Sequence, residues 1–82
     1  YKMYEIEVVR KYGDEFNIES IEEKTNGRFK TEREALKFAK GIKLRSGKTF
    51  FEEIHLLKID KNGDIIENEY IRSSDLRWIG AE

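Results

Sequence analysis

The sequence contains no cysteine and no proline, and it has one histidine among its 82 residues. The absence of cysteine excludes disulfide bonds, thiolate ligands for zinc or an iron–sulfur cluster, and thiol catalysis. A single histidine excludes a metal site built from several imidazoles. No apolar run approaches the roughly 20 residues that a membrane-spanning helix requires, and no signal-peptide pattern opens the chain. We therefore expect a cytoplasmic protein that contacts no membrane and binds no cofactor.

The chain also lacks repeats, low-complexity stretches and any proline-rich linker. Its length is that of one folding unit, so we expect a single domain over residues 1–82. A domain of this size buries only about 60–65% of the surface that its unfolded chain exposes. One modest core and no deep cavity follow from that fraction.

Charge is abundant but unevenly distributed. The net charge is −1, which by itself predicts no affinity for nucleic acid. Residues 28–48, however, carry eight basic side chains and two acidic ones, whereas the segments on either side are acidic. An asymmetry of this size can steer partners. Its simpler explanation is internal, with a basic helix lying near acidic strand ends of the same molecule.

Apolar residues alternate with polar ones in four stretches, which is typical of half-buried strands. We expect these strands at 2–12, from 16 to a turn at 25–27 (Thr-Asn-Gly), and at 49–60 and 64–72. Between the second and the third, Thr31 and Glu34 have the spacing of a capping box, in which each side chain satisfies a free backbone N–H of the other residue. An amphipathic helix is therefore predicted from about residue 32. It ends either near residue 45, before Ser46-Gly47, or earlier, at Gly41 in a Schellman cap. Its buried side is expected to carry Ala35, Phe38, Ala39 and Ile42.

Asn62-Gly63 separates the last two stretches, and Asn-Gly between two such runs is the strongest short-range hairpin signal. A two-residue type I′ turn at this point fixes the register of the two strands. The pairs that it predicts are Lys61–Asp64, Lys58–Glu67, Ile59–Ile66, His55–Tyr70 and Ile54–Ile71. Opposite charges then lie across from one another, which favours this register.

The predicted fold class is α+β, with the elements in ββαββ order. A four-stranded antiparallel sheet carries one amphipathic helix on one face and ends in a short C-terminal segment. The strand at 49–60 has apolar residues on both faces, and a single helix covers only one of them. The second face must be covered by the C-terminal segment, by a second copy of the chain in a homodimer, or by another protein. The candidate protein-interface residues are Ile54, Leu56, Ile71 and Trp78.

Basic side chains on the predicted helix give an alternative site, which would bind nucleic acid. The candidate contacts are Arg33, Lys37, Lys40 and Lys43. Such a stripe could neutralise about three to five phosphates in weak, salt-dependent binding. It lacks the exposed aromatic residues of single-strand binders, because Phe38 is expected on the buried side. A solvated helix face is the commoner role of such a stripe.

The sequence contains no recognisable catalytic motif. Residues 46–49 imitate the end of a phosphate-binding loop but follow a helix instead of preceding one. His55 has no nucleophile near it in sequence, and a strand histidine packed against Tyr70 is the favoured interpretation. The adjacent carboxylates Glu22-Glu23 point to opposite faces of a strand, as do Glu52-Glu53. We therefore expect no enzymatic activity and no catalytic residue.

The order of the elements, together with residues 29–35 (Phe-Lys-Thr-Glu-Arg-Glu-Ala) and 60–64 (Asp-Lys-Asn-Gly-Asp), resembles small bacterial ββαββ domains of unknown function. The resemblance covers residues 2–72 and implies a fold but no activity. The helix-opening segment is also similar to that of the arm-binding domains of phage integrases, which read DNA with a three-stranded sheet. The first two strands depart from those domains in carrying many glutamates, which would repel phosphate. The hypothesis that follows is a bacterial or phage interaction module without catalytic function. It binds protein or itself through the second sheet face or a strand edge, with nucleic-acid binding as the alternative.

Overall fold

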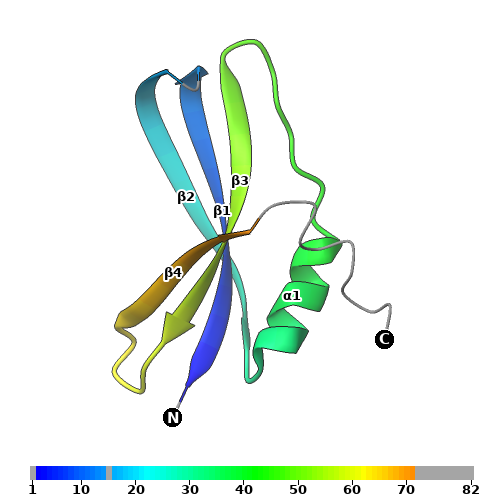
Figure 1. Cartoon of the computed structure of the whole chain (residues 1–82), viewed down its shortest axis with the longest axis vertical. Helices are drawn as coiled ribbons and strands as arrows, with labels where there is room; N and C mark the ends of the chain where they lie inside the picture. The colour runs from blue at the N-terminus through cyan, green and yellow to red at the C-terminus, as the bar shows by residue number, and fades with distance from the viewer. Residues whose placement is uncertain (1, 15, 72–82) are drawn as a thin grey trace.

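The computed structural model of the chain describes residues 2–14 and 16–71. The expectations for the C-terminal segment, including an interface role for Trp78, lie outside these residues. The described elements are β1 (Met3–Asp14), β2 (Asn17–Phe29), α1 (Glu32–Lys40), β3 (Phe50–Ile59) and β4 (Ile65–Ile71). They form one antiparallel sheet in the order β2-β1-β3-β4, with α1 beside it (Figure 1). The predicted α+β fold in ββαββ order is confirmed.

A single core fills the space between the sheet and α1. Ala35 and Ala39 of the helix are fully buried, and their small side chains allow α1 to lie close to the strands. The buried members of this core are Ile6, Ala35, Ala39, Ile54, Leu56 and Ile71. Burial of apolar surface at about 25 cal/mol per Å² makes this layer the main stabilising contact of α1.

Local signals set both ends of α1. Thr31 caps the N-terminus, where its Oγ1 accepts a hydrogen bond of 3.2 Å from the backbone N–H of Glu34. The helix ends at Lys40, so the longer alternative near residue 45 is wrong. Gly41 follows with φ −82°, which is not the left-handed conformation of a Schellman cap. Residues after Gly41 leave the helix because Ile42 and Leu44 turn to pack against the core. No helix in the described part of the chain has the length and apolar character needed to cross a membrane.

The β3–β4 hairpin has the predicted outer register but a different turn. Ile54–Ile71, His55–Tyr70 and Lys58–Glu67 are paired as expected, whereas Ile59 pairs with Ile65 rather than Ile66. A type I′ turn needs positive φ at both central residues. Gly63 has φ 86°, but no described residue other than glycine has positive φ. The turn is closed instead by hydrogen bonds from the N–H of Gly63 to the carbonyl of Asp60 (3.1 Å) and from the N–H of Asp60 to the carbonyl of Asp64 (3.0 Å).

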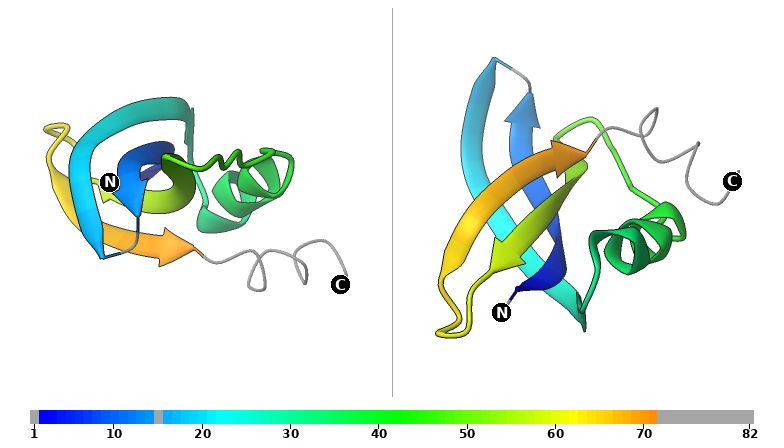
Figure 2. Two further views of the ribbon diagram at one scale, coloured as in Figure 1. Left: turned by 90° about the horizontal axis from the view of Figure 1, so that it is seen from above. Right: turned by 60° about the horizontal axis from the view of Figure 1, so that its bottom comes forward.

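β2 is longer than its sequence pattern indicates, because the strand continues through Asn26-Gly27 to Phe29. Two register shifts against β1 leave Glu19 and Gly27 without a partner residue. Between these bulges the ladder is regular from Ser20 to Asn26. The sheet as a whole is strongly twisted and curved, and β2 forms one of its two edges (Figure 2).

Candidate functional site

The apolar residues predicted to form a protein interface lie in the core. Ile54, Leu56 and Ile71 are 1%, 4% and 6% exposed and pack beneath α1. They are therefore inaccessible to a partner in the folded chain. The sequence pattern showed that β3 is apolar on both faces, but nothing in it indicated which of the two faces the helix covers.

The face of the sheet that turns away from α1, here called the far face, is closed by polar side chains. Its centre is apolar and buried, with Val9 5%, Leu57 2% and Ile59 4% exposed. Around this centre runs a network of charged groups in which Glu53 accepts hydrogen bonds from Lys11 (3.1 Å) and His55 (3.0 Å). Long polar side chains cover apolar neighbours while keeping their heads in water. The far face is thus not the open apolar surface that the sequence suggested.

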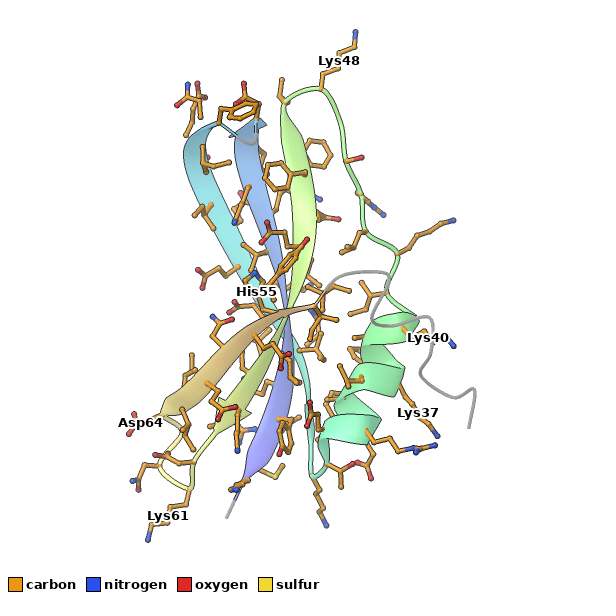
Figure 3. The ribbon with its side chains drawn as sticks, in the orientation of Figure 1. Lys37, Lys40, Lys48, His55, Lys61 and Asp64 are labelled. Carbon is orange, nitrogen blue, oxygen red and sulfur yellow. The ribbon has the colours of Figure 1, made fainter. Side chains whose placement is uncertain are left out.

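His55 is held from three sides. Its Nε2 contacts Glu53, its Nδ1 lies 2.7 Å from Oδ1 of Asn68, and its ring meets the ring of Tyr70 edge-on with centroids 5.7 Å apart. Figure 3 shows His55 on the side of the sheet opposite α1, where β4 is paired with β3. The predicted pairing of His55 with Tyr70 is confirmed. Both ring nitrogens are therefore engaged by neighbouring side chains of β3 and β4.

Two glutamates beside His55 have pKa values shifted in opposite directions. Burial, the charge of Glu23 and a hydrogen bond with Glu23 raise the pKa of Glu7, which is the only buried charged residue in the described part of the chain. Burial also acts to raise the pKa of Glu53, but the hydrogen bonds from His55 and Lys11 outweigh it, so that pKa lies below its ordinary value. For each carboxyl group, the neighbouring charges and hydrogen bonds thus decide whether its pKa is raised or lowered.

The candidate nucleic-acid contacts are exposed and lie on two elements. Lys37 and Lys40 project from α1 away from the sheet (Figure 3). Arg33 is exposed on the same helix, whereas Lys43 lies beyond its end. Phe38, expected on the buried side, is 42% exposed, and its ring packs against that of Phe29 with the ring centroids 5.2 Å apart. Lys43 therefore belongs to a different surface from the other three.

That surface is an open groove of about 780 Å³ between the middle of β2 and the segment that follows α1. Its floor and walls come from three strands and from residues 43–45. The lining residues are Val8, Arg10, Glu22, Glu23, Lys24, Asn26, Lys43, Arg45 and Glu52. The volume falls in the range of ligand pockets, about 300–1,000 Å³. The lining is far more charged than such pockets usually are, which suits a polar partner segment better than a small apolar molecule.

The wall formed by residues 42–45 follows from an alternating sequence. Ile42 and Leu44 pack against the core, so Lys43 and Arg45 face outward. The segment is fixed by Glu52, which accepts a 2.7 Å hydrogen bond from the backbone N–H of Arg45. Glu52 also pairs with Arg10 at 3.0 Å. Burial acts to raise the pKa of Glu52, but the Arg45 N–H and the Arg10 guanidinium outweigh it and the pKa is lowered.

Three cations of the groove are not matched in this way. Arg10 is neutralised by Glu52, whose pKa is lowered by the charge of Arg45 as well. Among the described residues, however, the structure gives no ion pair to the side chains of Lys24, Lys43 and Arg45. The sequence pattern alone does not reveal this group, because its members come from a strand and from a segment predicted to be helical. The alternation of residues 42–45 was the available signal, and it would have placed Lys43 and Arg45 on one side.

The second feature of this side is the free edge of β2. Every position from Asn17 to Thr25 whose side chain is described is exposed, and in the part of the chain that the structure covers no strand pairs with the outer edge of β2. The regular stretch from Ser20 to Asn26 coincides with the residues that β2 contributes to the groove. An unpaired row of N–H and C=O groups and a charged groove therefore lie side by side.

Comparison of the chain with models of protein families, with curated proteins and with solved structures gives no match.

Proposed function

We propose that this chain is a non-catalytic interaction module that binds an extended segment of a protein partner along the outer edge of β2. The observation that carries the proposal is the regular edge from Ser20 to Asn26, exposed and unpaired among the described residues. An edge of this kind is a template for strand addition, in which main-chain hydrogen bonds supply affinity. Proline would block it, and the sequence contains none.

The bulges at Glu19 and Gly27 support the same proposal. Bulges and charges are the usual means by which proteins protect a sheet edge from indiscriminate pairing. Here they confine regular pairing to the short stretch between them. A confined edge favours one short partner segment over open-ended aggregation.

The charge pattern disfavours self-association through this edge. Two copies of β2 that pair edge to edge are antiparallel and related by a twofold axis perpendicular to the sheet. The axis passes beside one central residue, which lies opposite its own copy, and residues equally far before and after it lie opposite each other. A centre at Glu22, Glu23 or Lys24 puts that residue opposite its own copy, and a centre at Ile21 puts Glu19 opposite Glu23. A centre at Ser20, Thr25 or Asn26 pairs at most three residues of the regular stretch with their copies. Like charges directly opposite each other are destabilising. The proposed partner is therefore a different protein rather than a second copy of this chain.

The proposal retains three expectations from the sequence: a bacterial or phage origin, a cytoplasmic location and no catalytic role. Nucleic-acid binding is the alternative, and Lys24, Lys43 and Arg45 of the groove favour it. Glu22 lines the same groove on the face of Val8 and Arg10 and opposes it, because carboxylates repel phosphate.

A pair of proline variants tests edge binding. Heptapeptides selected from a random library against the immobilised chain serve as probes. Adjacent N–H groups in a strand point to opposite sides, so one of Lys24→Pro and Thr25→Pro removes an outward donor and keeps the fold, as judged by circular dichroism. That variant should lose the selected peptides, whereas alanine at the same position, which keeps the N–H, should retain them. Equal binding by the folded proline variant and its alanine control would contradict the proposal.

A further inference from the structure

We infer that the partner segment is a strand antiparallel to β2 with an acidic residue opposite Lys24, basic residues opposite Glu23 and Glu22, and an apolar residue opposite Ile21. This inference rests on the proposed function of β2 as a docking edge and adds the chemistry of the partner. Antiparallel pairing is chosen because it is somewhat more stable per residue than parallel pairing. Read along the partner, the order is acidic, basic, basic, apolar.

The acidic position follows from the groove. Lys24 pairs with Val8 of β1 and so lies on the same face of the sheet as the groove floor. Lys43 and Arg45 line the groove beside it, and Glu52 is already engaged by Arg10 and by the Arg45 backbone. An acidic side chain opposite Lys24 therefore enters a region with three cations, which is the strongest charge preference that the edge offers.

The first basic position follows from the far face. Glu23 pairs with Val9 and turns away from α1 toward Glu7. The charge of Glu23 helps to raise the pKa of Glu7, because the two carboxylates repel each other when both are ionised. A cation opposite Glu23 offsets this repulsion.

The remaining positions depend on Glu22 and Ile21. Glu22 receives a 3.1 Å hydrogen bond from the hydroxyl of Tyr12 but has no cation bound to it among the described residues. A basic residue opposite Glu22 supplies one. Ile21 is 52% exposed on the far face, and an apolar side chain opposite it buries part of that surface.

Two blocked heptapeptides of identical composition provide the test. The first, Thr-Val-Glu-Lys-Arg-Ile-Thr, sets the acidic residue opposite Lys24 and the valine opposite Thr25. The second, Thr-Val-Lys-Glu-Arg-Ile-Thr, exchanges two residues and so creates like-charge pairs with Lys24 and Glu23. Binding to the full chain is followed by the backbone amide shifts of residues 20–26. Two reversed pairs should weaken binding roughly tenfold. The double variant Glu23→Lys with Lys24→Glu should reverse the preference.

The outcomes separate the two proposals. A preference for the first peptide that the double variant reverses supports the inferred pattern. Equal binding of both peptides at residues 20–26 overturns the pattern but leaves edge binding in place. Absence of any shift at residues 20–26 with either peptide overturns edge binding as well. A short mixed-sequence DNA duplex is the last arm: if it shifts Lys24, Lys43 and Arg45 while the peptides do not, the groove binds nucleic acid and the inference is wrong.

Discussion

Glu7 on β1 lies directly across the ladder from His55 on β3, and it is buried to 8% exposure although it is charged. His55 acts to lower the pKa of Glu7, but burial and the nearby Glu23 act in the opposite direction and prevail. The centre of the far face therefore holds a carboxylate that is destabilised by its surroundings. Folding tolerates it because its neighbours on β3 and β4 form a satisfied polar network.

Replacing Glu7 should stabilise the protein at neutral pH. The pKa of Glu7 is higher in the folded chain than in the unfolded one, so ionisation opposes folding once the pH rises above the unfolded value. Glu7→Gln should raise the free energy of unfolding at pH 7 and raise it by less at pH 4, where more of the folded carboxyl is protonated. Urea titration at both values measures this difference. Glu19→Gln, an exposed position on β2, is the control and should change little. A loss of stability at pH 7 would show that Glu7 is favourably paired.

Replacing Glu53 should have the opposite sign. The pKa of Glu53 is lowered on folding, so its contribution is present above the unfolded pKa and is lost as the pH falls through the folded one. Glu53→Gln should lower the free energy of unfolding by about 1–2 kcal/mol at pH 7 and by much less at pH 3. Glu67→Gln is a matched control, because Glu67 is 66% exposed and lies 3.9 Å from Lys58. If Glu53→Gln lowered the free energy of unfolding equally at both pH values, the lowered pKa of Glu53 would be contradicted.

Charge placed at Leu56 should unfold the chain. Leu56 is 4% exposed beneath α1, and a buried unpaired charge is among the most destabilising changes known. Leu56→Lys should lose its circular dichroism signal or its cooperative transition, whereas Ile66→Lys at a position 52% exposed should keep both. A folded Leu56→Lys monomer would mean that α1 does not cover this face.

Two glycines with positive φ should differ in their tolerance of alanine. Gly63 has φ 86° and open space around its added Cβ, so Gly63→Ala should cost only the left-handed backbone strain, about 1–2 kcal/mol. Gly13 has φ 122°, and an added Cβ collides with the carbonyl oxygen of Asn17. Gly13→Ala should therefore lose at least 1 kcal/mol more, measured by thermal or urea unfolding. A larger loss of stability for Gly63→Ala than for Gly13→Ala would contradict the close contact between Gly13 and Asn17.

Much of this fold could be predicted because its signals are local. Alternation located the strands, Thr31 located the start of α1, and opposite charges at Lys58 and Glu67 fixed the register of the last hairpin. The end of α1 could not be predicted, since the choice depends on Ile42 and Leu44 finding the core. Which face of β3 the helix covers could not be predicted either, because both faces of this strand are apolar.

The groove was harder to predict than the fold. Arg10, Lys24 and Lys43 belong to separate elements, and only the strand order and the path of residues 42–45 bring them together. Sequence reasoning grouped Lys43 with the helix stripe by helical spacing. That grouping failed because the helix ends at Lys40, after which Ile42 and Leu44 pack against the core and Lys43 is exposed between them.

The most direct test of the open edge is amide hydrogen exchange over Ser20–Asn26 in the 82-residue chain. An open edge predicts an alternating pattern, in which the N–H groups bonded to β1 are protected and those that point outward exchange nearly as fast as in an unfolded peptide. Adding the heptapeptide Thr-Val-Glu-Lys-Arg-Ile-Thr should slow the outward group and leave the inward one unchanged. Protection of every amide in the free protein would show that this edge is already covered. Unchanged exchange at saturating peptide would contradict strand addition to β2.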